Sequence, residues 1–220
     1  MSLITIEKKV LEANNTIADE NRNRFKERNY FTINLISSPG SGKTSLIEQT
    51  IKSLKDKFKI AVITGDIQTS LDAERIDKLS VPVVQIITNG GCHLDASLVR
   101  NAYKEIENQD IDLLIIENVG NLVCPAEYDL GEDCKVAVMS VTEGDDKPLK
   151  YPLIFHHSEA FVINKTDLVP FLKCSVEEMK QNALTIKPKL EVFATSCYTN
   201  DGMDKWIKWL ENQLNLNKNT

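Results

Sequence analysis

The sequence has no long hydrophobic run. No apolar stretch approaches the roughly 20 residues that span a bilayer, and residues 1–19 lack the apolar segment of a signal peptide. Basic residues are in the minority, because 26 Lys and Arg stand against 32 Asp and Glu, which gives a net charge of −6. Proteins that coat nucleic acid usually carry the opposite balance. We therefore expect a cytoplasmic protein that partners neither a membrane nor a nucleic acid.

Cysteine is sparse and odd in number, with five residues in the chain. An odd count without a secretion signal disfavours a disulfide framework. Cys134, Cys174 and Cys197 have no nearby Cys or His in the sequence, so we expect them to pack in the core. Cys92 and Cys124 stand in loops and are treated below as candidate metal ligands.

Apolar runs alternate with amphipathic segments from residue 31 onward, which predicts an α/β fold with a mostly parallel sheet and helices on both faces. Helical segments are expected at Thr44–Leu54, Leu71–Leu79, Asp95–Glu107, Val176–Ile186 and Gly202–Leu214. The expected strands are Phe31–Ile36, Ile60–Thr64, Val83–Ile87, Ile111–Glu117, Val136–Val141, Ala160–Asn164 and Glu191–Thr195.

Residues 1–28 read as a helical arm that precedes the main domain, residues 29–220. Ile6, Val10, Ala13 and Ile17 recur at helical spacing, as in an amphipathic helix that lies against the main body. The alternative is an arm that contacts a partner protein or a second copy of the chain.

The segment Ser37-Ser38-Pro39-Gly40-Ser41-Gly42-Lys43-Thr44 lies between a predicted strand and a predicted helix. That context is typical of a phosphate-binding P-loop, in which backbone N–H groups and a helix N-terminus hold an anion. Lys43 would reach the β- and γ-phosphates, and the Thr44 hydroxyl would bind Mg²⁺. Ser37 replaces the glycine that usually opens the motif. The predicted nucleotide contacts are Ser38, Pro39, Gly40, Ser41, Gly42, Lys43, Thr44 and Ser45.

The segment Asn164-Lys165-Thr166-Asp167 follows another predicted strand. The Asp167 carboxylate can accept hydrogen bonds from both N1–H and the exocyclic amine of guanine, which adenine cannot offer. Asn164 would support the loop, and the stem of Lys165 would pack over the base. Together with the P-loop, these residues predict GTP rather than ATP as the nucleotide.

Acidic residues end two further strands. We assign Asp66 to the Mg²⁺ shell or the attacking water, and Glu117 to the Mg²⁺ shell through water. Asp72 is a second candidate for aligning the water, although capping of the following helix would also account for it. Lys147 adds positive charge near the phosphates or is an ordinary surface lysine.

Cys92 and His93 are adjacent, and Cys124 follows a neighbouring strand. Two thiolates and an imidazole suit Zn²⁺ or Ni²⁺, and a two-fold dimer would supply further ligands. Spacing alone leaves buried, structural cysteines equally possible.

These motifs together resemble the nickel-insertion GTPases of hydrogenase maturation, the HypB family. The resemblance extends over nearly the whole chain and is carried by residues 37–44, 65–69, 72–75, 92–96, 116–125, 142–147 and 164–167. Its most specific part is Cys-His-Leu-Asp-Ala at 92–96 combined with Glu-Asn-Val-Gly-Asn-Leu-Val-Cys-Pro at 117–125.

The resemblance implies a three-layer P-loop domain with seven strands and a slow, switch-type GTPase that forms a homodimer around GTP or GDP. It implies Ni²⁺ or Zn²⁺ on Cys92, His93 and Cys124, and as partners the small zinc metallochaperone HypA and the hydrogenase large-subunit precursor. Ser196 stands where the family places a base-contacting loop, but Tyr198 replaces its lysine. The alternatives are a urease-type nickel accessory GTPase, whose metal motif places Pro between Cys and His, and a P-loop small-molecule kinase.

Overall fold

The computed structural model describes residues 6–218. It is built on a sheet of seven strands in which every neighbouring pair is parallel. The order across the sheet is β3-β2-β4-β1-β5-β6-β7. The predicted α/β, P-loop-type fold with a parallel seven-stranded sheet is confirmed. The strands are β1 (Phe31–Ser37), β2 (Ile60–Asp66), β3 (Val83–Ile87), β4 (Leu113–Glu117), β5 (Cys134–Ser140), β6 (Ser158–Asn164) and β7 (Glu191–Ala194).

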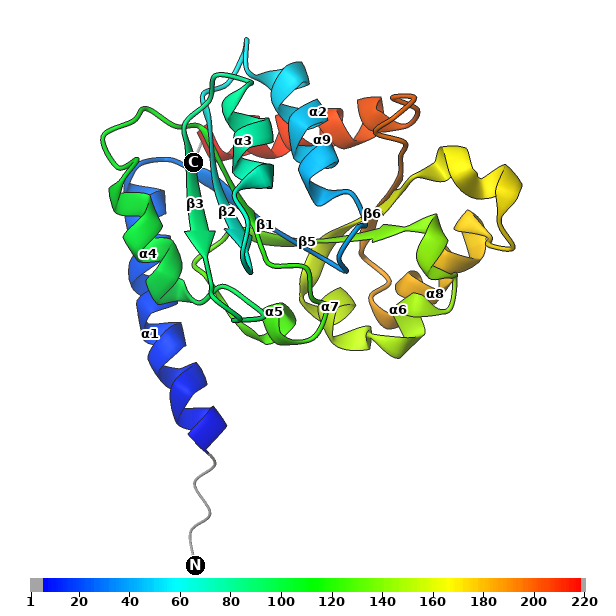
Figure 1. Cartoon of the computed structure of the whole chain (residues 1–220), viewed down its shortest axis with the longest axis horizontal. Coiled ribbons are helices and arrows are strands. Elements are labelled where there is room, and N and C mark those ends of the chain that lie inside the picture. The colour runs from blue at the N-terminus through cyan, green and yellow to red at the C-terminus, as the bar shows by residue number, and fades with distance from the viewer. Residues whose placement is uncertain (1–5, 219–220) are drawn as a thin grey trace, which may run out of the picture.

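Helices cover both faces of the sheet and make the outer two of three layers (Figure 1). One face carries α2 (Lys43–Leu54), α3 (Leu71–Asp77) and α9 (Met203–Lys218). The other carries α1 (Ile6–Glu27), α4 (Ala96–Lys104), α5 (Cys124–Glu127), α6 (Lys147–Lys150), α7 (Pro152–His157) and α8 (Val176–Ile186). Two 3₁₀ turns, η1 (Val141–Glu143) and η2 (Thr166–Phe171), follow β5 and β6.

The central strands are buried along their whole length, as both-sided cover requires. All seven residues of β1 and all seven of β5 are buried, which is why these segments read as nearly continuous apolar runs. Because the strands all run the same way, their carboxyl ends meet at one edge. Ligands of such sheets bind at this edge, near the strand where the connections change direction.

The buried face of α1 differs from the prediction. Val10 and Ala13 are exposed and Ile17 is half-buried, while the side chain of Ile6 lies outside the described part of the structure. This face packs against loop backbone as well as apolar side chains, so polar residues can be buried on it through hydrogen bonds. Its members follow one another at spacings of four, three and four residues: Asn14, Ala18, Asn21 and Phe25.

Three short helices, α5, α6 and α7, were not predicted. Each has proline at its first or second position: Pro125, Pro148 and Pro152. Proline favours a helix start because its φ is already helical, but helices of four to six residues show no periodicity in a sequence.

Within residues 6–218, no helix has the length and apolar character needed to cross a lipid bilayer. The helix α1 shares a hydrophobic cluster with α4, in which the Phe25 and Tyr103 rings meet edge to face with centroids 5.2 Å apart. The division of the chain at residue 28 stays a prediction.

Candidate functional site

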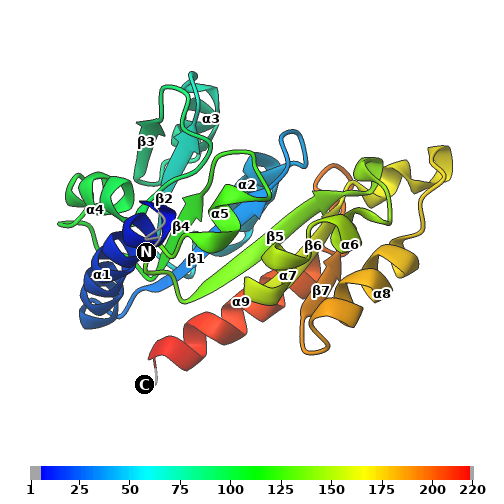
Figure 2. The same cartoon turned by 90° about the horizontal axis from the view of Figure 1, so that it is seen from below.

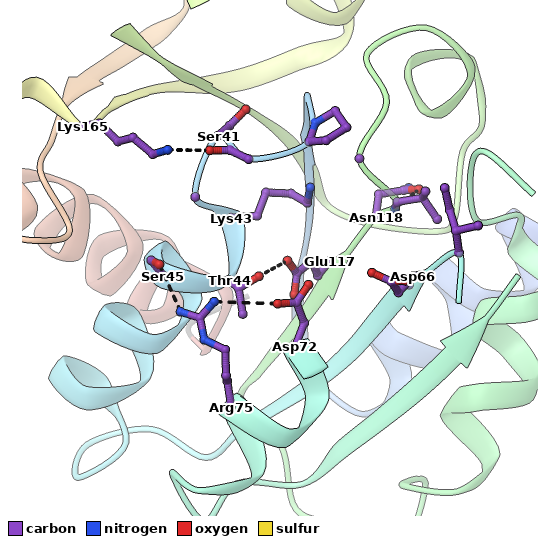
Figure 3. A pocket seen from close by; sticks show the side chains of 17 residues that line it. Ser41, Lys43, Thr44, Ser45, Asp66, Asp72, Arg75, Glu117, Asn118 and Lys165 are labelled. Carbon is purple, nitrogen blue, oxygen red and sulfur yellow. Dashed lines mark hydrogen bonds and ion pairs between the residues drawn. The ribbon is translucent and has the colours of Figure 1, made fainter. Parts of the chain in front are cut away.

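The P-loop connects β1 to α2 at the carboxyl edge of the sheet. Two of its glycines have positive φ, 77° at Gly40 and 95° at Gly42. A Cβ on Gly42 would lie 2.4 Å from Asn164 Nδ2, so both the backbone angle and the space require glycine there. Residues 39–45 line one cavity of about 460 Å³ (Figure 3), and Ser38 lines a smaller neighbouring cavity with Pro39. The cavity is large enough for a nucleotide's phosphates.

Lys43 is buried beneath this loop and 9% exposed. Its Nζ donates a hydrogen bond to Ser37 Oγ over 2.8 Å. Burial lowers the pKa of Lys43, against the opposing pull of nearby acids that include Glu117 and Asp72. The serine that replaces the first glycine of the motif thus supplies a buried partner for the P-loop lysine.

Glu117, at the end of β4, is 3% exposed and points to the first turn of α2. Thr44 Oγ1 donates to Glu117 Oε1 over 2.7 Å, while Glu117 Oε2 has no hydrogen-bond partner within the described residues. Burial raises the pKa of Glu117 to about 7. A buried carboxylate oxygen without a partner, next to a threonine hydroxyl, is suited to a hard cation such as Mg²⁺.

The two other predicted acids line the same cavity (Figure 3). Asp66 ends β2, and its Oδ1 accepts the N–H groups of Gln68 and Thr69 at 2.9 and 3.0 Å. Burial alone would raise the pKa of Asp66, but these backbone hydrogen bonds outweigh it and lower the pKa. Asp72 lies inside α3, whose N-cap is Ser70, so the structure does not support helix capping as its role.

Arg75 is a cavity-lining residue to which the sequence analysis gave no role. Its guanidinium makes two hydrogen bonds to the Glu48 carboxylate, at 2.9 and 3.1 Å, and one to Ser45 Oγ at 3.1 Å. It also lies 3.7 Å from the carboxylate of Asp72. Arg75 therefore links α3 to the start of α2. In the sequence, the i, i+3 spacing of Asp72 and Arg75 was the one sign that Arg75 pairs with an acid of the site.

The predicted guanine-binding residues lie beside the P-loop, at the end of β6. Asn164 Nδ2 donates to the Ser41 carbonyl over 3.0 Å, and Lys165 Nζ donates to the Gly40 carbonyl over 2.7 Å. Ser196 Oγ donates to Asp167 Oδ1 over 2.5 Å. These bonds orient the Asp167 carboxylate and hold its loop against the phosphate loop.

A second cavity, of about 260 Å³, lies beside the phosphate cavity and shares Gly42, Ser45 and Lys165 with it. Its wall includes Asp167 and Tyr198. Tyr198 is 89% exposed. The arrangement offers a pocket for a base, with the Asp167 carboxylate in its wall, next to a cradle for phosphates.

Lys147 does not line the phosphate cavity but lines the neighbouring cavity that contains Ser38 and Pro39. Its Nζ is 3.5 Å from Glu143 Oε2 and lies over the ring of Tyr151. Glu143 in turn accepts a hydrogen bond from Ser41 Oγ over 2.7 Å. Lys147 is thus connected to the P-loop through Glu143, a residue that the sequence analysis passed over.

Cys92, His93 and Cys124 come together in one cluster. The Sγ atoms of Cys92 and Cys124 are 3.2 Å apart, and Cys92 Sγ is 3.6 Å from His93 Nδ1. One ligand atom from each residue lies within 4.8 Å of the others, and among the described side chains no other group of Cys, His, Asp or Glu meets this criterion. The His93 ring packs on Tyr128 with centroids 3.9 Å apart, and burial lowers the pKa of His93. Two sulfur atoms and a neutral imidazole nitrogen suit Ni²⁺ or Zn²⁺.

Residues 118–123 connect this cluster to the phosphate site. Asn118 Oδ1 accepts the Leu94 N–H over 3.0 Å, and Asn121 Nδ2 donates to the Cys92 carbonyl over 3.2 Å. A Cβ on Gly120 would lie 3.0 Å from Pro39, so this loop rests directly on the P-loop. Both asparagines stood in a motif of the sequence, but spacing alone did not show that they join the two sites.

The remaining cysteines lie outside the cluster. Cys134 and Cys197 are buried, and Cys174 is half-buried. Burial raises the pKa of all three thiols, that of Cys197 to about 11. None of the three belongs to the ligand cluster found among the described residues, so the structure gives them no part in a metal site.

Comparison with known proteins agrees with this geometry. A family model described as CobW/HypB/UreG, nucleotide-binding domain, matches residues 31–194. The hydrogenase maturation factor HypB of Escherichia coli K12 is 48% identical over 211 residues, which are 96% of this chain and 73% of that protein. The chain belongs to the HypB family.

Solved structures of the HypB family have the same fold. HypB from Archaeoglobus fulgidus has a TM-score of 0.87 at 39% identity, with 93% of this chain and 100% of that chain covered. HypB from Helicobacter pylori in complex with nickel has a TM-score of 0.88 at 37% identity, with 93% and 96% covered. The resemblance seen in the sequence is confirmed, and the fold and the family are those that it implied.

Proposed function

We propose that this protein is a Mg²⁺-dependent GTPase that binds Ni²⁺ and delivers it during [NiFe]-hydrogenase maturation. The observation that carries the proposal is the cluster of Cys92, His93 and Cys124, which a six-residue loop joins to Glu117. A metal-ligand set that shares a connecting segment with a phosphate site suits a protein whose nucleotide controls its hold on a metal. Turnover is slow in this proposal, because the nucleotide acts as a switch.

GTP or GDP would occupy the two adjoining cavities, with phosphates on residues 38–45 and the base at Asp167. The Ser196 hydrogen bond to Asp167 supports this, because it orients the carboxylate that must accept two guanine donors. Asn164 and Lys165 brace the pocket through the P-loop carbonyls. An adenine base would offer the Asp167 carboxylate no matching pair of donors, so we disfavour the alternative of an adenine-specific small-molecule kinase.

Thr44, Asp66 and Glu117 would hold Mg²⁺, which neutralises charge between the β- and γ-phosphates when bound. The fit is supported by the unpartnered, buried Oε2 of Glu117. Lys43, which is 9% exposed, would bind the phosphates as a cation that water screens little. Asp66 or Asp72 would orient the attacking water, since both line the cavity.

Ni²⁺ is the cargo in this proposal, and Zn²⁺ would compete for the same ligands. One chain offers three ligands, while Zn²⁺ sites are commonly four-coordinate. A homodimer formed through the face that carries Cys92 would bring two such sets together and complete the coordination. The exposure of Cys92 supports this arrangement.

The partners that we propose follow from the family: the small zinc metallochaperone HypA and the hydrogenase large-subunit precursor. A urease-type accessory function is the alternative, because the matching family model also includes UreG. We place it second because Cys92 and His93 are adjacent here, with no intervening proline.

The test compares metal binding and nucleotide binding in matched variants. Cys92→Ala combined with Cys124→Ala should abolish stoichiometric Ni²⁺ and Zn²⁺ binding in equilibrium dialysis and leave GTP binding intact. Cys174→Ala, outside the cluster, should change neither. Unchanged metal stoichiometry in the double variant would overturn the ligand assignment. Equal calorimetric affinities of the wild type for GTP and ATP would overturn the nucleotide assignment.

A further inference from the structure

The helix α1 lies alongside α4 and next to the segment that follows α5 (Figure 1 and Figure 2). It carries two deeply buried asparagines, Asn14 at 6% and Asn21 at 2% exposure. They are seven residues apart, so they lie two turns apart on one face. Asn15 and Asn23, close to them in the same helix, are exposed. Burial of these two amides is therefore specific to their positions.

The two asparagines bracket the start of α4 and the chain that follows α5. Asn14 Oδ1 accepts the Ala96 N–H over 2.9 Å, and Asn14 Nδ2 donates to the Asp129 carbonyl over 2.8 Å. Asn21 Nδ2 donates to the Ala96 carbonyl over 2.9 Å and to the Leu130 carbonyl over 3.0 Å. Each asparagine thus holds both segments at once, although they are more than 30 residues apart in sequence.

Both bracketed segments come directly after candidate metal ligands. Ala96 is three residues beyond His93, and Asp129 is five residues beyond Cys124. Between Cys124 and Asp129, Tyr128 packs its ring on His93 with centroids 3.9 Å apart. The side chains of α1 therefore fix the spacing between the two pieces of chain that carry the ligands.

The helix approaches this region too closely to be a loosely attached arm. A Cβ on Gly131 would lie 2.7 Å from the Ala18 carbonyl oxygen and 2.8 Å from the Arg22 nitrogen. Apolar contacts would tolerate a helix that slides by a turn, but buried amides lose their partners when it moves. The asparagines therefore specify one position of α1 against both segments.

We infer that Asn14 and Asn21 are positioning residues of the metal site, which set the distance between the Cys92–His93 segment and Cys124. The inference deepens the proposed function and rests on its metal site. Residues that orient metal ligands through hydrogen bonds commonly change metal affinity by 10- to 100-fold when they are replaced. A protein that displaces α1 would, by the same route, loosen the metal cluster.

The test uses the full chain with Asn14→Ala and Asn21→Ala, and with Asn15→Ala and Asn23→Ala as controls. Ni²⁺ affinity, measured by competition with a chromogenic chelator, should fall about tenfold in the first pair and stay unchanged in the controls. The thiolate-to-nickel absorption band should shift only in the first pair. GTP affinity, measured in parallel, identifies the variants that keep their fold.

A second measurement needs no metal. Dibromobimane bridges two nearby thiols, and peptide mass spectrometry locates the bridge. Bridging of Cys92 to Cys124 should be fast in the wild type and the controls and several-fold slower in the asparagine variants. If Asn21→Ala does not fold, Asn14→Asp keeps the acceptor for Ala96, loses the donor to Asp129 and should also slow bridging.

Wild-type bridging rates and nickel affinities in folded Asn14 and Asn21 variants would overturn the inference. Slow bridging in those variants, together with a wild type that binds no nickel, would support the positioning role and overturn the proposed nickel function. The two ideas can therefore fail separately.

Discussion

The hydroxyl of Ser37 accepts a hydrogen bond from the Lys43 ammonium over 2.8 Å. Both residues are buried, Ser37 completely, so this bond provides the nearest polar partner of a cation with little access to water. A buried cation without a partner is costly. The phosphates of a bound nucleotide would give Lys43 stronger, charged partners.

Replacement of Ser37 by alanine should therefore destabilise the nucleotide-free chain more than the GTP-bound chain. We expect a loss of about 2 kcal/mol in the free energy of unfolding without nucleotide, because the Lys43 ammonium loses its partner. With saturating GTP, the loss of unfolding free energy should shrink to a few tenths of a kcal/mol. Urea unfolding with and without GTP measures the difference. Ser53→Ala, on the exposed side of α2, is the control, and an equal loss in both states would contradict the argument.

Replacement of Asp167 by asparagine should lower GTP affinity by about 10²-fold or more, because the amide cannot accept two guanine donors. Affinity for xanthosine triphosphate should rise, since its C2 carbonyl can accept from the new amide. Calorimetry with both nucleotides makes the comparison. Asp204→Asn, exposed in the first turn of α9, should leave both affinities unchanged. Retained guanine preference in the Asp167 variant would show that the base binds elsewhere.

Gly131 and Gly90 offer a matched test of how closely α1 is docked. Both have strongly positive φ, 93° and 104°, but an added Cβ at Gly90 meets nothing within 4 Å. Gly90→Ala should cost about 1–2 kcal/mol from backbone strain alone. Gly131→Ala should cost at least ~1 kcal/mol more, because its Cβ collides with the backbone of α1. Urea denaturation gives both values, and equal losses would mean that α1 moves aside freely.

The ion pair between Arg22 and Asp129 predicts a pH dependence of stability. Burial alone would raise the pKa of Asp129, but hydrogen bonds from the Gly131 N–H and from Arg22 outweigh it and lower the pKa. The ordinary pKa is about 3.9, so the stabilisation is complete above pH ~4 and is lost as the pH falls towards the lowered value.

Wild type should therefore lose more unfolding free energy than Asp129→Asn between pH ~4 and pH ~2. Urea denaturation at a series of pH values measures this loss. Asp19 is the other carboxylate next to Arg22, and its side chain is largely exposed. Asp19→Asn should therefore have the smaller effect. Parallel pH curves for wild type and Asp129→Asn would contradict the prediction.

The sequence predicted the parts of the site that follow strands. Asp66, Glu117 and Asn164 end parallel strands, and the P-loop that leads to Lys43 follows another, so strand direction alone brings them to one edge of the sheet. The proximity of Cys92 and Cys124 was harder to predict, because the distance between them depends on the conformations of two loops. The resemblance to a family, rather than their spacing, identified them as a pair.

Other features depend on tertiary contacts that local pattern does not encode. Asn14 and Asn21 look like solvated residues of a polar helix, and only the opposing carbonyls of residues 96, 129 and 130 give them a reason to be buried. The apolar stripe expected on α1 was wrong for the same reason. Arg75 links α3 to α2 through Glu48, which is 27 residues away in the sequence, so local spacing could not show this contact.

Six residues, 118–123, are all the chain that separates Glu117 from Cys124. This segment is tied to residues 92 and 94 and leans on the P-loop at Gly120. Because these contacts hold the segment on both sides, we expect a displacement of the end of β4 to be passed along it. In the proposed function, a change at the phosphates that moves Glu117 would therefore also move the sulfur atom of Cys124.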